Sequence, residues 1–211
     1  DGHMAALVGA AVLLNTSAVR QKIPSNSGVR LLFQPAEETP GGAQPMIRDG
    51  ALRGVHEVYG WHNWPTAPVG TLLMTDGTIM AHDADFYITI SGRGGHGSAP
   101  HACIDPIPCG AGMVLALQTI VARTLPSDTN AVVSVTMFHA GEATNVIPDT
   151  AKLCGTIRDL DSAVYESICA AMRRIADSTA AAHQCTAEVQ IVPGYAETAN
   201  GPEGVATGTM P

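Results

Sequence analysis

The chain has 211 residues, 45% hydrophobic and 14% charged, which is the balance of a globular protein and excludes a disordered one. Its net charge of −8 argues against nucleic acid or an anionic membrane as its main partner. The apolar run 4–14 is also shorter than the ~20 residues that a membrane span needs. The five cysteines form no CxxC pair and no signal-like leader is present, so we expect reduced thiols in a cytoplasmic protein.

The first part of the chain alternates between helical and strand patterns. Residues 4–17 predict a helix, 28–33 a nearly continuous apolar strand, 43–53 a short helix, and 55–60 and 69–75 two further strands. Continuous apolar strands are typical of a parallel sheet covered on both faces. This part therefore predicts a piece of an α/β domain.

A second unit begins near His82. Its strands are predicted at 84–91, 131–138, 151–158 and 186–192, and its helices at 106–123 and 162–183, the latter with Ser162 as N-cap. This βαββαβ order is that of a split-βαβ, ferredoxin-like sandwich. We expect domains at 1–82, 83–194 and 195–211, with the last segment returning to the first domain.

Two adjacent carboxylates, Glu37 and Glu38, follow the predicted strand 28–33. Burying like charges side by side costs several kcal/mol unless a cation or a proton compensates. A solvated pair in a turn is the simplest alternative. The histidine of the run Trp61-His62-Asn63-Trp64-Pro65 follows the next predicted strand, and carboxyl ends of neighbouring strands meet at one edge of an α/β sheet. A Glu/His metal site is therefore favoured.

His3 opens the first predicted helix beside Asp1. An Asp near a His is suited to orient a metal ligand, and capping of the helix is an equally good interpretation.

The second unit contains three further candidates. The run Gly92-Arg93-Gly94-Gly95-His96-Gly97-Ser98 presents His96 on a loop whose glycines allow close approach or a positive φ; a tight turn is the alternative. Asn145 could donate hydrogen bonds to a substrate carbonyl or carboxylate, or form an Asx-turn. Arg158 could clamp a carboxylate, or pair with a neighbouring aspartate.

Taken in order, these motifs resemble a family of dinuclear metallo-amidohydrolases. The family includes hippurate hydrolase, N-acyl-L-amino-acid amidohydrolase and plant auxin-conjugate hydrolases, and it is related to aminoacylase and the zinc carboxypeptidases. The segments that carry the resemblance are DGHMAALVGAA, FQPAEETPGGA, WHNWP, GRGGHGSAPH, DPI, NVIPD and GTIRDLD. Each segment alone is weak, and their shared order over essentially the whole chain is specific.

The resemblance implies a role for each candidate. Glu37 is expected to be the general base, and Glu38 and His62 are expected to be metal ligands. His96 is expected to reach the partner subunit's active site and stabilise the oxyanion, while Asn145 and Arg158 contact substrate. The implied cofactors are two divalent ions (zinc, manganese, nickel or cobalt) with no organic group. The implied substrate is an N-acyl amino acid, and the implied assembly is a homodimer through the second unit, which acts as a lid.

One departure from the family pattern limits the expected activity. In the family a Cys-Gly-His segment that carries two ligands precedes Asp-Gly-His, and a further ligand lies in a C-terminal segment. Both ends of this chain are expected to be cut, which leaves only Glu38 and His62 of the ligand set. We therefore expect the chain alone to be weakly active or inactive. The alternatives are a non-catalytic dimerisation fragment, or a peptidase or acyl-ornithine-type deacylase of the same superfamily.

Overall fold

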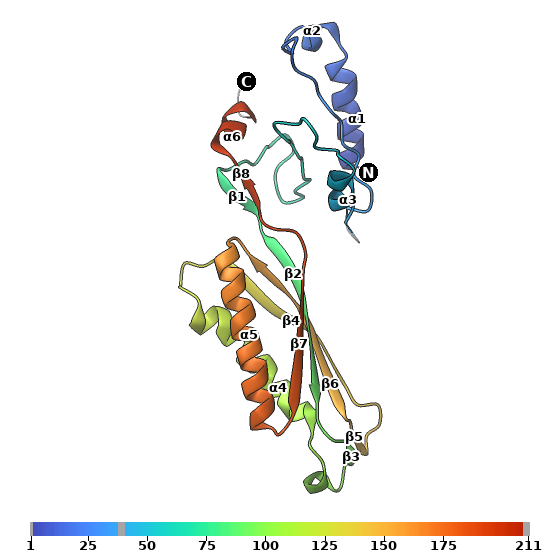
Figure 1. Ribbon diagram of the computed structural model, residues 1–211, viewed down its shortest axis with the longest axis vertical. Coiled ribbons are helices and arrows are strands. Elements are labelled where there is room, and N and C mark those ends of the chain that lie inside the picture. Colours follow the sequence, from blue (N-terminus) through green and yellow to red (C-terminus); the bar gives the residue numbers. More distant parts are fainter. Residues whose placement is uncertain (1, 38–40, 209–211) are drawn as a thin grey trace. The chain divides into compact units, whose positions relative to one another are not determined.

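The computed structural model describes residues 2–37 and 41–208, and the chain divides into two compact units, Asp1–Leu73 and Met74–Pro211. Figure 1 gives the course of each unit. The mixture of helices and strands confirms the predicted α/β class. In the described part, no helix has the length and apolar character needed to cross a bilayer.

Short helices are the only regular elements in the described part of the first unit. They are α1 (Gly2–Leu14), α2 (Ser17–Arg20) and α3 (Ala43–Arg48). The Ala- and Leu-rich sequence of α1 explains its helical state, since these residues have the highest helix propensity. None of its side chains is buried, so packing contributes little to its stability.

The strands predicted at 28–33, 55–60 and 69–75 are wrong: these segments are extended or irregular, and they form no ladder within residues 2–37 and 41–73. A β-strand needs the hydrogen bonds of a neighbour, so an apolar run alone does not create one. Arg30 instead bonds to the carbonyl oxygens of Ala51 and Arg53, at 2.7 and 3.0 Å. Val29 and Val58 remain 57% and 64% exposed.

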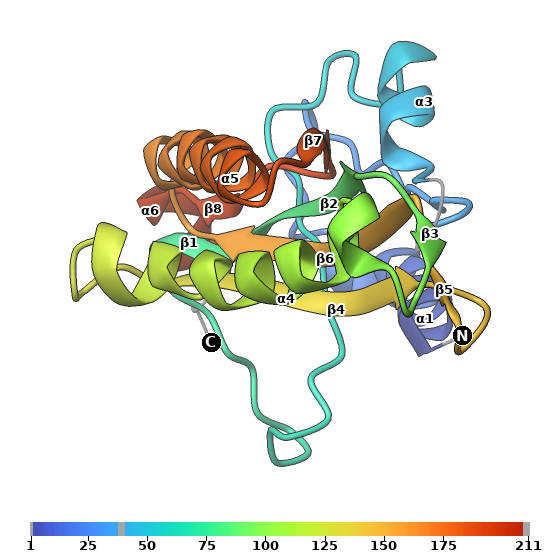
Figure 2. The same cartoon turned by 90° about the horizontal axis from the view of Figure 1, so that it is seen from below.

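The second unit is built on a four-stranded antiparallel sheet in the order β4-β6-β2-β7. The strands are β2 (His82–Ser91), β4 (Ala131–Ala140), β6 (Thr150–Asp159) and β7 (Thr186–Pro193). The helices α4 (Pro106–Leu117) and α5 (Ser162–Ala182) connect them, and Figure 2 shows both helices against the sheet. The predicted βαββαβ order is confirmed, with every strand end within two residues.

Smaller elements surround this sandwich. A two-stranded ladder joins β1 (Gly77–Met80) to β8 (Thr198–Asn200), and another joins β3 (Gly95–His96) to β5 (Val146–Ile147). A 3-10 turn covers Pro100–Ala102 and a π-helical turn covers Ile120–Thr124, so the predicted helix 106–123 is in fact two pieces. The last helix is α6 (Pro202–Gly208).

The core lies between the sheet and its two helices. Along β2, Phe86, Ile88 and Ile90 are buried, while Asp85 and Tyr87 on the opposite face are exposed. This alternation is the period-2 signal of a strand with one covered face. The helices contribute the buried side chains of Cys109, Met113 and Leu117 from α4, and of Ile168, Met172 and Ala176 from α5.

Aspartates cap the two helices that pack on the four-stranded sheet. Asp105 Oδ1 accepts from the Ile107 N–H at 2.9 Å, and Asp161 Oδ1 accepts from the Ala163 N–H at 2.7 Å. The predicted N-cap Ser162 is therefore wrong by one residue. Asp161 is in the extended conformation that an N-cap requires, which places Ser162 inside the helix.

The C-terminus of α5 is a Schellman motif without glycine. Gln184 N–H bonds to Ala181 O at 3.1 Å and Cys185 N–H to Ala180 O at 2.9 Å, and Gln184 has a φ of 61°. A left-handed conformation costs a non-glycine residue roughly 1–2 kcal/mol.

Replacing Gln184 by glycine is therefore expected to stabilise the second unit by about 0.5–1 kcal/mol, after the extra entropy of the unfolded chain is included. Urea denaturation followed by circular dichroism measures the change. Gln184→Ala is the matched control, because it removes the same exposed side chain but keeps the strain. Equal stabilities for the two variants would contradict the proposed origin of the gain.

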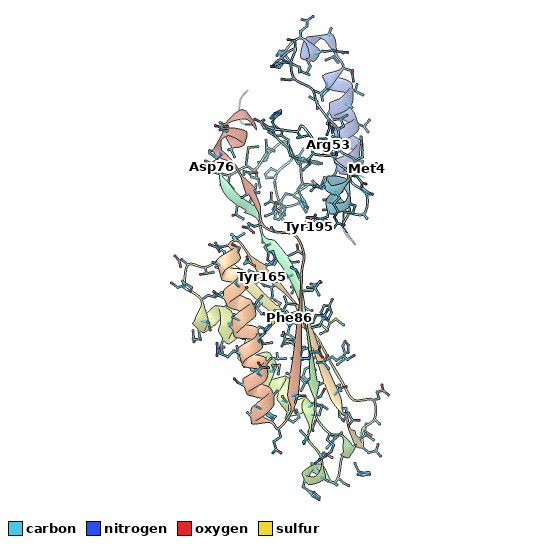
Figure 3. All side chains as sticks on the ribbon, viewed as in Figure 1. Met4, Arg53, Asp76, Phe86, Tyr165 and Tyr195 are labelled. Carbon is cyan, nitrogen blue, oxygen red and sulfur yellow. The ribbon has the colours of Figure 1, made fainter. Side chains whose placement is uncertain are left out.

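A buried hydrogen bond between a histidine and an aspartate fastens the start of β2 to the end of β6. His82 Nδ1 lies 2.9 Å from Asp159 Oδ2, and the side chains are 10% and 0% exposed. The ring of Tyr165, labelled on α5 in Figure 3, packs edge-on against the His82 ring, with 4.3 Å between the two ring centroids. Burial, and then a hydrogen bond with Cys169, raise the pKa of Tyr165 to about 12, so it remains a neutral phenol at neutral pH. This cluster closes one end of the core.

Candidate functional site

Two histidines of the first unit lie together around the main chain of Asn63. The Asn63 N–H donates to His3 Nε2 at 2.9 Å, and His62 Nδ1 lies 2.8 Å from the Asn63 carbonyl oxygen. The two imidazole centroids are 5.5 Å apart. The helix α1 positions His3, and the irregular run after residue 60 positions His62.

These hydrogen bonds assign different chemistry to the two rings. A carbonyl oxygen only accepts, so in the neutral ring His62 carries its proton on Nδ1 and presents a lone pair on Nε2. That is the usual arrangement of a metal-ligating histidine. A main-chain N–H only donates, so the Nε2 lone pair of His3 is already used. His62 is therefore the better candidate ligand, and His3 supports the loop that carries it.

The carboxylates of the first unit are only partly described. Glu37 is exposed in a turn, while Glu38 and Asp1 lie outside the described residues. Within residues 2–37 and 41–208 no three His, Cys, Asp or Glu side chains gather closely enough to hold a metal ion. The donor set thus fits a metal site in kind, through imidazole and carboxylate, but not in number.

The second unit brings His96 and Asn145 together at one end of its sheet. His96 pairs with Val146 in the β3–β5 ladder, and the Gly97 N–H bonds to the Asn145 carbonyl oxygen at 2.8 Å. His96 and Asn145 are both exposed. The sequence places them far apart, and a ladder of only two residue pairs makes them neighbours.

Close packing explains the glycines before His96. A Cβ on Gly92 or Gly94 would lie within 3.0 Å of the carbonyl oxygens of Ile104 and Ile147, respectively. A positive φ does not explain these glycines, because none is found at Gly92, Gly94, Gly95 or Gly97. The glycines are explained by the close approach of their backbone, and at Gly92 and Gly94 the neighbour is the protein's own main chain.

Asp149 is a residue whose role sequence reasoning missed. Its Oδ1 accepts from the Gly94 N–H and its carbonyl oxygen accepts from the Gly92 N–H, both at 2.8 Å. It therefore fastens the glycine loop to the connection between β5 and β6. The available signal was an aspartate at the end of the Asn-Val-Ile-Pro-Asp run.

Arg158 lies near the end of β6, whereas His96 and Asn145 lie at the β3–β5 ladder beside the start of β6. Eight residues of strand separate it from Thr150, which corresponds to roughly 26 Å. Its guanidinium donates to the Thr156 hydroxyl and, at 2.8 Å, to the Ile157 carbonyl oxygen. The structure does not bring Arg158 together with His96 and Asn145 in one subunit.

None of the five cysteines is paired, and all lie in the second unit. Burial, and then the neighbouring Cys185, raise the pKa of Cys109 to about 11, so this thiol stays protonated at neutral pH and is a poor nucleophile.

Known proteins are similar to this chain over almost its whole length. Residues 84–184 match the model of the peptidase dimerisation domain of the M20 family. An N-acetylcysteine deacetylase of Bacillus subtilis is 40% identical over 193 residues, which are 92% of this chain and 50% of the relative. An N-acyl-L-amino acid amidohydrolase of Geobacillus stearothermophilus is 39% identical over 97% of this chain and 54% of its own length.

A solved structure agrees with these relatives. The Bacillus subtilis YXEP protein, described as a dinuclear metal binding peptidase from the M20 family, is 33% identical with a TM-score of 0.77, covering 97% of this chain and 50% of that one. The chain belongs to the M20 family. This M20 chain spans about half the length of the curated relatives it matches.

Proposed function

We propose that the protein hydrolyses the amide bond of N-acyl amino acids, giving a carboxylic acid and an amino acid. The observation that carries the proposal is the likeness of at least 92% of the chain, at about 40% identity, to a deacetylase and an amidohydrolase of such substrates. Glu37, His62, His96 and Asn145 all belong to the run of motifs that resembles this family.

The first unit is proposed to supply the proton-transfer and metal-binding groups. Two divalent ions, as the neighbour's description suggests, would lower the pKa of a water molecule and polarise the amide carbonyl. Glu38 and the free Nε2 of His62 would be two of their ligands, with zinc, manganese, nickel or cobalt as the proposed metals. Glu37 would take the proton of the water and pass it to the leaving amine. Asp1 and His3 would support the ligands.

The second unit is proposed to supply groups that bind the substrate. His96 would donate a hydrogen bond to the oxyanion, a contribution typically worth ~10²–10³-fold in kcat. Asn145 beside it would bind the substrate's polar groups. Arg158 would bind a carboxylate at the other end of the sheet.

The distance between the two ends of the sheet favours a site shared between subunits. His96 and Asn145 lie at one end and Arg158 at the other, so one substrate of ordinary size cannot contact all three from a single subunit. A homodimer through residues 84–184 would remove this difficulty. His96 and Asn145 of one subunit could then contact the substrate that is bound by the other subunit. The five unpaired cysteines support the proposed cytoplasmic location.

An assay of amide hydrolysis by the full-length protein tests the proposal. Released amino acid is measured with hippurate and with N-acetyl amino acids, after loading with Mn²⁺ or Zn²⁺, and dipeptides test the peptidase alternative. We expect turnover of the N-acyl amino acids and two metal ions per subunit by elemental analysis. Chelation should abolish the turnover. A metal-free protein without turnover would favour the non-catalytic dimerisation fragment instead.

A further inference from the structure

The imidazole of His96 receives two polar contacts from one residue, Ser98. The Ser98 main-chain N–H lies 3.2 Å from His96 Nδ1, and the Ser98 hydroxyl oxygen lies 2.8 Å from the same nitrogen. A main-chain N–H can only donate, so Nδ1 must present its lone pair. In the neutral ring the proton is then on Nε2.

A closed turn holds Ser98 in this place. The Ala99 N–H donates to the His96 carbonyl oxygen at 2.8 Å, which makes Ser98 the third residue of a four-residue turn. The Gly97 N–H bonds to the Asn145 carbonyl oxygen, and the β3–β5 ladder holds His96 itself. The backbone on both sides of Ser98 is thus fixed, and its N–H and hydroxyl meet the same ring nitrogen.

We propose that Ser98 is a positioning residue, which orients the His96 ring through Nδ1 and so presents Nε2–H as a hydrogen-bond donor. In the exposed His96 side chain this N–H is the group that an oxyanion would meet. The use of that donor in catalysis rests on the proposed function, whereas the tautomer of the ring does not. Ser98 acts through His96 and need not touch the substrate.

Steady-state kinetics of the metal-loaded, full-length protein measure how much the Ser98 hydroxyl contributes to kcat. Ser98→Ala keeps the main-chain N–H and removes the hydroxyl, so we expect kcat to fall about 5- to 10-fold, the equivalent of one hydrogen bond, with KM within about twofold. Ser98→Thr should restore most of kcat because it retains the hydroxyl. Ser167→Ala is the matched control: it removes a hydroxyl that bonds to Ala163 on α5 and should leave kcat unchanged.

Nitrogen NMR of histidine-labelled protein tests the tautomer without any turnover. At about pH 8.5, where ordinary imidazole side chains are neutral, the His96 signals are assigned by their loss in His96→Gln. We expect an unprotonated, hydrogen-bonded Nδ1 in the wild type, a shifted Nδ1 signal in Ser98→Ala and a wild-type signal in Ser98→Thr.

The two measurements separate failure of this proposal from failure of the proposed function. A proton on Nδ1 in the wild type overturns the proposal, and so does a Ser98→Ala variant with unchanged nitrogen shifts or unchanged kcat. If no N-acyl amino acid is hydrolysed with either metal, the proposed function fails and the catalytic role of Ser98 fails with it. The NMR result then still decides whether Ser98 sets the tautomer.

Discussion

Glu37→Gln is expected to lower kcat by about 10²–10⁴-fold in the metal-loaded protein while leaving its metal content unchanged. Glutamine has the shape of glutamate but cannot accept a proton from water. In the proposed mechanism Glu37 moves that proton, whereas Glu38 and His62 bind metal. Steady-state kinetics with hippurate or an N-acetyl amino acid give kcat, and elemental analysis gives the metals bound per subunit.

Glu188→Gln provides the matched control for this experiment. Glu188 is an exposed glutamate on β7, and its replacement changes the net charge by the same amount without touching the proposed site. Kinetics like those of the wild type are expected. Retained turnover in Glu37→Gln would remove Glu37 as the base. Loss of metal together with turnover would instead make Glu37 a ligand.

Gly155→Ala is expected to destabilise the second unit by about 3 kcal/mol or more, at or beyond the upper end of the usual cost of overpacking. Gly155 is on β6, paired with Phe86 of β2 and with Val135 of β4. A Cβ there would lie within 3.0 Å of the Ser134 carbonyl oxygen and of the Phe86 ring. Neither neighbour can move easily, because one is ladder backbone and the other is a fully buried ring.

Urea denaturation and the melting temperature measure this loss. Gly112→Ala is the control, because the same substitution on α4 would place its Cβ no closer than 3.7 Å to a neighbour. Replacing a mid-helix glycine there should stabilise the unit by about 0.5–1 kcal/mol. If both variants lost stability equally, the crowding at Gly155 would not be the cause.

The fold of the second unit could be predicted from the sequence because its signals are local. Phe86, Ile88 and Ile90 alternate with polar residues, and this period requires a strand with one buried face. The helical pattern of 162–183 is equally regular and long. The predictions failed where a neighbour decides the outcome: the run 28–33 is as apolar as a strand, but it meets no ladder partner in the described part of the first unit.

For the candidate site, the sequence by itself determined the residue types and their order. The Glu37-Glu38 pair, His62, His96 and Asn145 could be named as candidates without coordinates, because few residue types serve as metal ligands, bases and donors and because their motifs resemble a known family.

Only the tertiary structure decided which of these residues meet. The β3–β5 ladder makes His96 and Asn145 neighbours, while the length of β6 separates Arg158 from both. The hydrogen bonds around Asn63 distinguish His62 from His3, and Ser98 fixes the ring of His96. The pairing of His96 with Val146 and the contact of His3 with Asn63 join residues distant in the chain, and they depend on strand register and packing that no local pattern encodes. The contact of Ser98 with His96 is local, but it depends on side-chain orientations that the residue types alone do not determine.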